Sequence, residues 1–186
     1  MDNPVTEDFS PEINYEKSIQ KHRLIYKITG GRVFSEAANW LMFSLFIFIS
    51  LQPLLFGRTP STGVVILITL FISWMLSNAL LNYSLVKIPG TTINENRAAI
   101  RLAINKFVTV KDFKVDNDVM MRSFKPTGHP FWGKIVTILF DGTEMYLNIT
   151  STGKSENPTM IHGLRNYIKA KRIARYYKSN FIDIKH

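Results

Sequence analysis

Two long apolar stretches near the middle of the chain dominate its pattern of hydrophobic and polar residues. Residues 37–57 carry no charge, Arg58 follows alone, and residues 59–86 are again uncharged, which gives runs of 21 and 28 residues. A helix crosses a bilayer with roughly 20 mostly apolar residues, whereas a buried helix of a soluble domain usually keeps charges on its wet face. The pattern therefore predicts two membrane-spanning helices.

The connection between the two stretches is rich in turn residues and too short to hold a domain. Residues 37–86 are therefore expected to form an antiparallel helical hairpin. Short cytoplasmic loops are enriched in Lys and Arg. Five such residues precede the first span and Lys87 follows the second, whereas the turn contains Arg58 alone. Both termini are expected on the cytoplasmic side of a plasma membrane or bacterial inner membrane.

Polar residues within the spans allow two interpretations. With the turn centred near Pro60, Asn39 of the first span comes level with Asn78 and Asn82 of the second. These amides either hydrogen-bond between the two helices or line a polar path in an oligomeric channel. Neither span contains an ionisable residue, which ion and proton pathways usually need, so packing is the favoured interpretation.

The residues after the spans have the pattern of an antiparallel sheet. Segments 98–104, 106–115 and 119–124 contain β-branched or aromatic residues in partial alternation. Segments 134–140 and 143–150 flank Asp141-Gly142, a pair typical of a type I′ hairpin turn. The sequence predicts five or six antiparallel strands.

A C-terminal helix is predicted from Asn157-Pro158, by a capping residue followed by proline at the first helical position. Its first half carries a stripe suited to covering the open face of the sheet, formed by Met160, Ile161, Leu164, Tyr167 and Ile168. Beyond Ala170 basic residues occupy that sector, so the helix is expected to leave the domain there or to change its packing partner. The predicted contact surface is its basic, aromatic end: Lys169, Lys171, Arg172, Arg175 and Lys178, with Tyr176 and Tyr177 as interfacial anchors.

The predicted domain plan has three parts: a polar and basic segment 1–36, the hairpin 37–86 and a basic β-rich domain 87–186. A positive run from Lys17 to Arg32 is interpreted as an interfacial segment at anionic headgroups, opposite the C-terminal helix. Gly30-Gly31 is expected to end any helix that precedes the first span.

The charge of the chain favours a lipid partner over a nucleic acid. The net charge is +9, and residues 87–186 contain 17 Lys and Arg against 8 Asp and Glu. A basic domain tethered to a membrane lies closer to anionic headgroups than to any nucleic acid. A membrane protein partner or a second copy of the chain is an alternative partner for this surface.

The sequence contains no recognisable catalytic or metal-binding motif. There are four histidines and no cysteine, and no histidine has a ligand partner at metal-binding spacing. The phosphate-binding loop, the serine nucleophile elbow and the zinc-peptidase motif are missing. A non-enzymatic protein without cofactor or metal is expected.

The order of these parts resembles small bacterial membrane proteins that carry a pleckstrin-homology-like domain after a transmembrane pair. The resemblance covers residues 37 to about 175 and rests on the hairpin, the strands 134–150 and the helix after Pro158. It implies a seven-stranded bent sheet capped by one helix, and a binding or scaffolding role. We therefore expect a membrane hairpin with an α+β cytoplasmic domain that binds anionic lipid headgroups or a protein partner. The alternative is an oligomeric channel or transport-complex subunit with a ring of cytoplasmic β domains.

Overall fold

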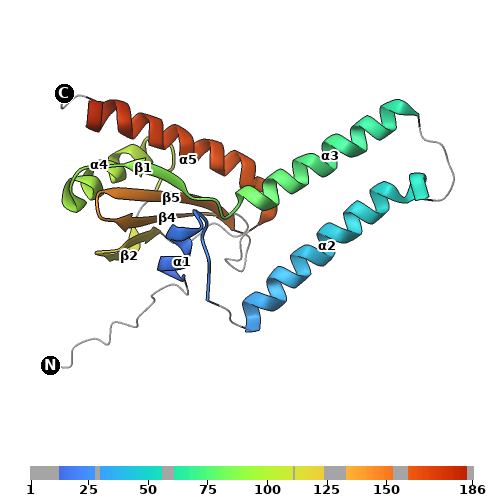
Figure 1. The fold of residues 1–186 in the computed structure, drawn as a ribbon, viewed down its shortest axis with the longest axis horizontal. Coiled ribbons are helices and arrows are strands. Elements are labelled where there is room, and N and C mark those ends of the chain that lie inside the picture. Colours follow the sequence, from blue (N-terminus) through green and yellow to red (C-terminus); the bar gives the residue numbers. More distant parts are fainter. Residues whose placement is uncertain are drawn as a thin grey trace.

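A computed structural model describes residues 13–27, 30–55, 61–110, 112–123, 133–152 and 159–183 (Figure 1). The helices and strands follow in the order α1 (Tyr15–Gln20), α2 (Gly30–Leu55), α3 (Thr62–Leu81), β1 (Val86–Pro89), α4 (Ile93–Asn105), β2 (Phe113–Asn117), β3 (Met120–Ser123), β4 (Gly133–Asp141), β5 (Glu144–Thr152), a 3₁₀ turn (Met160–His162), α5 (Gly163–Tyr177) and a π-helical end (Lys178–Ile182).

The strands form one open antiparallel sheet in the order β1-β5-β4-β3-β2. Strands β2 to β5 are neighbours in sequence and in space, while β1 joins the other side of β5. The predicted α+β class and the lower of the two predicted strand counts are therefore confirmed for the described residues. The sheet has fewer strands than the seven that the pleckstrin-homology resemblance implies.

The β4–β5 hairpin is the strand pair that the sequence predicts best. Its register runs from Gly133 opposite Thr152 to Asp141 opposite Glu144. The two-residue connection is Gly142-Thr143, and only Gly142 has positive φ, at +59°. A glycine at the first central position with one positive φ is the pattern of a type II′ turn, so the predicted type I′ turn is wrong.

The predicted strand 98–104 is wrong, because these residues belong to helix α4. Thr92 caps this helix, its hydroxyl accepting a hydrogen bond from the Glu95 amide at 3.5 Å. The helix buries Asn96, Ile100, Ala103 and Ile104, which recur at helical spacing. Thr92 and Glu95 form the sequence pattern of a capping box, a helix signal that outweighs the β-branched residues downstream.

The two short predicted strands before the hairpin are partly correct. Only the end of segment 106–115 is extended, in β2, and residues 106–110 form a turn and irregular chain. Segment 119–124 corresponds to β3, which pairs with both β2 and β4.

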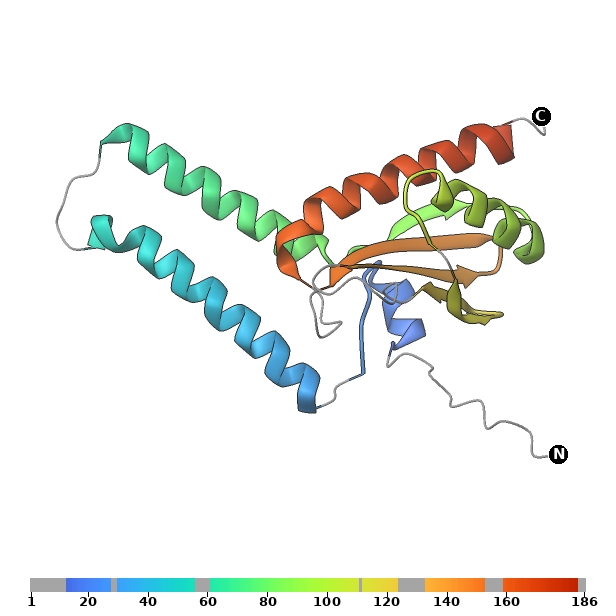
Figure 2. The ribbon, with the colours of Figure 1, turned by 180° about the vertical axis from the view of Figure 1, so that it is seen from behind.

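Helix α5 lies along one face of the sheet together with α4, and both contribute to the larger core (Figure 2). Its buried residues include Asn166, Ala170, Ile173 and Tyr177. The predicted apolar stripe is wrong, because Ile161 and Ile168 are 54% and 43% exposed. Beyond Ala170, departure from the domain is wrong, since Ile173 and Tyr177 continue the buried row, whereas the predicted change of partner fits the hydrogen bond from Tyr177 to Asn96 of α4.

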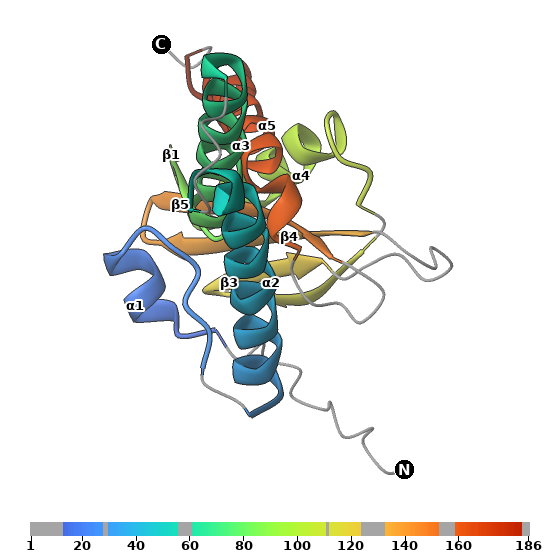
Figure 3. The ribbon, with the colours of Figure 1, turned by 90° about the vertical axis from the view of Figure 1, so that its right-hand side faces the viewer.

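The opposite face of the sheet is covered by the N-terminal segment 13–27, which includes α1 (Figure 3). Ile13 and Leu24 pack with Leu139 of β4 and Tyr146 of β5 in a second core. The structure therefore adds 13–27 to the domain that the sequence limits to 87–186. The predicted helix start at Ser10 lies outside the described residues.

Helices α2 and α3 project together from one end of this domain (Figure 1). Helix α2 begins at Gly30, so the expectation that Gly30-Gly31 ends a helix is wrong. Among the described residues, α3 alone is long and apolar enough to cross a membrane, and 11% of its apolar stretch is buried. The apolar part of α2, Trp40–Gln52, is shorter.

The C-terminal end of α3 is bonded to the domain. The Asn78 Oδ1 atom accepts a hydrogen bond from the Leu164 amide at 3.0 Å. The Asn148 amide of β5 donates to the carbonyls of Asn82 and Ser84 at 3.1 and 2.9 Å. Gly163 lies so close that an added Cβ atom would stand 1.9 Å from the Asn78 carbonyl oxygen.

Gly163→Ala should therefore destabilise the protein, because the methyl group would push α5 away from the α3 backbone. We expect a cost of about 1–3 kcal/mol, seen as a lower melting temperature of the full chain in detergent. Gly63→Ala is the matched control, since a Cβ atom there meets nothing within 4 Å. That variant should be neutral or gain up to about 1 kcal/mol. Equal melting temperatures for the two variants would contradict the close contact between α3 and α5.

Candidate functional site

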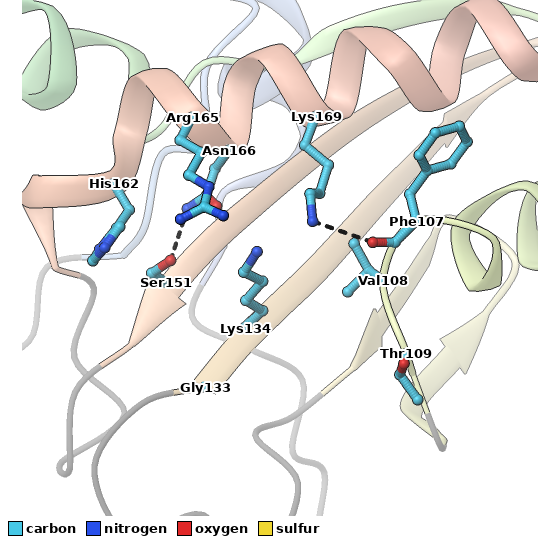
Figure 4. A pocket seen from close by; sticks show the side chains of 10 residues that line it. All are labelled: Phe107, Val108, Thr109, Gly133, Lys134, Ser151, His162, Arg165, Asn166 and Lys169. Carbon is cyan, nitrogen blue, oxygen red and sulfur yellow. Dashed lines mark hydrogen bonds between the residues drawn. The ribbon is translucent and has the colours of Figure 1, made fainter.

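A hollow of about 620 Å³ lies where the N-terminal half of α5 crosses the end of the β4–β5 hairpin (Figure 4). Its walls come from α5, from the start of β4, from the end of β5 and from residues 107–109 after α4. The basic side chains that line it are Lys134, His162, Arg165 and Lys169. Among the described residues that line it, none is a carboxylate.

Lys134 reaches the hollow because it continues the sheet row that faces α5. Val136, Ile138 and Phe140 occupy the next positions of that row and belong to the larger core. Lys134 stands opposite Ser151 in the β4–β5 register. The Ser151 hydroxyl accepts a hydrogen bond from the Asn166 side-chain amide at 2.9 Å, which fixes α5 above this row.

The cations of the hollow repel one another. Burial, followed by the nearby Lys169 ammonium and then the Arg165 guanidinium, lowers the pKa of Lys134 from 10.5 to about 8. Lys169 donates to the Phe107 carbonyl at 3.2 Å. The ion pairs of the described residues use Lys87, Arg97 and Arg101, and none includes Lys134, Arg165 or Lys169. Such a cluster is suited to bind a multiply charged anion.

A second hollow of about 600 Å³ lies between α5 and α3. Its apolar walls are Trp74 of α3 with Ile161, Leu164 and Ile168 of the C-terminal segment. His162, Arg165 and Lys169 line both hollows, so the two are neighbours along α5. Arg172 also lines the second hollow.

The structure divides the basic surface that the sequence predicts. Lys169 lines both hollows and Arg172 lines the second, whereas Arg175 and Lys178 are exposed further along the helix. Lys171 is exposed, with its ammonium 4.9 Å from the centre of the Tyr167 ring.

The two tyrosines of this surface face the domain. Tyr177 is 1% exposed and donates its hydroxyl hydrogen bond to Asn96 at 2.8 Å, which removes it from the predicted contact surface. Tyr176 is half-buried, and its ring lies 5.8 Å from that of Phe107.

The predicted amide contacts between the two spans are also placed differently. Asn78 bonds to Leu164 and donates to the Trp74 carbonyl at 2.8 Å, so its side chain serves α5 and its own helix. Asn82 is fully buried against the domain. The side chain of Asn39 lies outside the described part of the structure.

Two parts of the site were absent from the sequence prediction. Arg165 precedes the segment that the sequence selects, and Lys134 lies in a strand. The signal for Lys134 was its alternation with Val136, Ile138 and Phe140, which places a lysine in a buried row. Within the described ranges, no group of three His, Cys, Asp or Glu side chains is placed to hold a metal ion.

The reactivity of Lys134 should report its unusual environment. Since only the neutral amine reacts, acetylation of Lys134 in the full chain should rise with pH around a midpoint near 8. The Arg165→Gln/Lys169→Gln variant removes both neighbouring charges and should move that midpoint towards 10.5. Mass spectrometry of acetylated peptides measures both rates. A midpoint near 10.5 in the unaltered chain would contradict the cationic cluster.

Comparisons with known proteins assign no function to this site. No protein-family model, no curated protein and no solved structure matches the chain. The charges, contacts and placement of the described residues are therefore the basis for any functional conclusion.

Proposed function

We propose that this chain is a non-enzymatic integral membrane protein whose α+β domain binds anionic lipid headgroups. Helices α2 and α3 form the membrane hairpin in this proposal, and both termini lie on the cytoplasmic side of a plasma or bacterial inner membrane. The N-terminal half of α5 and the cationic hollow beneath it face the headgroups.

The exposed apolar surface of α3 is the observation that carries the proposal. Leu67, Leu70 and Leu80 are 67%, 61% and 57% exposed along this helix. A core helix of a soluble protein would bury such side chains, and continuous apolar surface of this size marks a contact with lipid or protein. The 20 residues of α3 span about 30 Å, the thickness of a bilayer's hydrocarbon core.

The connections of the two helices support a hairpin. The Leu24 amide donates to the Tyr83 carbonyl at 2.8 Å, and the Leu85 amide donates to the His22 carbonyl at 2.9 Å. The segment before α2 and the segment after α3 therefore lie side by side on one domain. If α3 crosses the membrane, α2 has to cross it in the other direction. Helix α2, with 26 residues, is about 39 Å long, which exceeds the thickness of the hydrocarbon core, and its apolar part Trp40–Gln52 would lie within that core.

The position of α5 supports a lipid ligand. Its N-terminal end lies beside the C-terminal end of α3, and the helix runs away from α3 from there (Figure 1). Arg165 and Lys169 therefore lie near the level where the apolar surface of α3 ends and headgroups begin. Each basic side chain near an anionic leaflet contributes roughly 1 kcal/mol, and the attraction decays over about 8 Å.

The alternatives have less support. An oligomeric channel needs Asn39, Asn78 and Asn82 at a lumen, whereas Asn78 is bonded to Leu164 and Asn82 is buried. The pleckstrin-homology likeness rests on the order of parts alone, and α4 separates β1 from β2 in this sheet. A protein partner for the basic surface is the remaining alternative, and the lipid test below distinguishes it.

The topology is testable by single cysteines, because the natural chain has none. Ser61→Cys, at the exposed start of α3, should react with an impermeant maleimide added outside intact cells. Ser179→Cys, exposed beyond α5, should react only after the membrane is permeabilised. Equal labelling of the two positions in intact cells would show that α3 does not cross the membrane.

Two variants with the same loss of charge test the lipid contact. Arg165→Gln/Lys169→Gln should reduce the retained anionic lipid roughly tenfold to thirtyfold, because both cations lie beside α3. Arg175→Gln/Lys178→Gln should have a smaller effect, since this pair lies on average about 14 Å further along the helix. Native mass spectrometry of the full chain, extracted from membranes of mixed zwitterionic and anionic lipid, measures the ratio. No change in either variant would favour a protein partner.

A further inference from the structure

The two hollows beside α5 share three lining residues, and each combines basic side chains with apolar ones. The first is cationic and half-enclosed, with Lys134, Arg165 and Lys169 converging on it (Figure 4). The second lies beside α3, where Trp74, Leu164 and Ile168 add apolar side chains to a lining that also includes Arg165, Lys169 and Arg172. Arg165 and Lys169 line both, so these two side chains are placed to contact both the charged and the apolar part of one ligand.

The spacing of residues along α5 produces this division. Ile161, Leu164 and Ile168 recur at intervals of three and four residues and form an apolar row beside α3. Arg165, Lys169 and Arg172 recur at four and three and form a parallel basic row. An apolar row next to a basic row matches the acyl chain and the charged head of one lipid molecule.

The charge of the cationic hollow selects among lipid headgroups. Three basic side chains without a carboxylate among the lining residues match a group with two negative charges better than a group with one. A phosphate monoester carries close to two negative charges at neutral pH, whereas a phosphodiester carries one. Burial and the neighbouring cations Lys169 and Arg165 lower the pKa of Lys134, and a bound anion would favour its charged form.

We propose that this site binds one phospholipid with a phosphomonoester headgroup, its phosphate held by Lys134, Arg165 and Lys169 and one acyl chain lying between α3 and α5. This inference rests on the proposed function, because the apolar hollow meets lipid only if α3 is in a membrane. It adds a defined site and a headgroup class to that function.

The test uses acetylation of Lys134 in the full chain, reconstituted in nanodiscs of phosphatidylcholine at pH 8. Adding phosphatidic acid to the nanodiscs should slow acetylation of Lys134 at least tenfold. The same fraction of phosphatidylglycerol, a phosphodiester, should slow it less than threefold. Soluble glycerol 3-phosphate at millimolar concentration should have little effect, because it lacks the acyl chain. The acetylation of exposed Lys171 in the same samples is the internal control.

Two variants test the two halves of the site. Ile168→Glu places a charge in the apolar hollow and should abolish protection by phosphatidic acid. Arg165→Gln/Lys169→Gln should do the same by removing the anion's partners. Ile93→Glu is a matched control, because Ile93 is exposed on α4 and lines neither hollow; it should leave protection unchanged.

Each contrary outcome overturns a stated part of the proposal. Equal protection by glycerol 3-phosphate and phosphatidic acid would overturn the acyl-chain contact, and equal protection by the two lipids would overturn the monoester preference. No protection by any of the three would overturn the site. In that case the cysteine topology and the retained-lipid ratio still decide the proposed function separately, since neither measurement involves Lys134.

Discussion

The attachment of the C-terminal end of α3 to the sheet and to α5 determines the arrangement of the rest of the molecule. A helix end leaves carbonyls without donors, and a helix start leaves amides without acceptors. Here Asn148 of β5 donates to the carbonyls of Asn82 and Ser84, while Asn78 of α3 accepts from the Leu164 amide at the start of α5. Strand β5 thus satisfies carbonyls at the end of α3, and α3 satisfies an amide at the start of α5, so the direction of α3 relative to the sheet is fixed.

The two-sided sheet explains how one domain holds both helices. Along β5, Leu147 belongs to the core beneath α4 and α5, and the adjacent Tyr146 belongs to the core beneath the N-terminal segment. One face is thus covered by residues that precede α2 and the other by residues that follow α3. The chain therefore leaves this domain at α2 and returns to it after α3. One face of the sheet needs the residues before α2 to be covered, and the other needs the residues after α3.

The sequence predicts a helix or strand well where the residues of that element determine its structure, and poorly where contacts with another element determine it. The β4–β5 hairpin and the apolar length of α3 are local patterns, and both could be predicted. The buried face of α5 could not be predicted, because the buried row that continues with Ala170, Ile173 and Tyr177 begins with the polar Asn166. Its burial is explained by the hydrogen bond that it donates to Ser151 on the sheet. Helix α4 was missed although its capping pattern is local. Lys134 could have been singled out by its phase in β4, but its neighbours Arg165 and Lys169 depend on how α5 crosses the sheet.

The basic side chains at the two ends of the domain differ in whether they form ion pairs. At the end far from α3, cations have carboxylate partners: Lys87 lies 2.6 Å from Glu144, and Arg101 pairs with Asp116. At the end beside α3, Lys134 and Arg165 have no carboxylate within ion-pair distance among the described residues. Holding like charges together in a half-buried hollow costs free energy, and a nearby anion would remove that cost. Since this end is also where the exposed apolar surface of α3 stops, the proposed lipid would contact both the cations and the apolar surface.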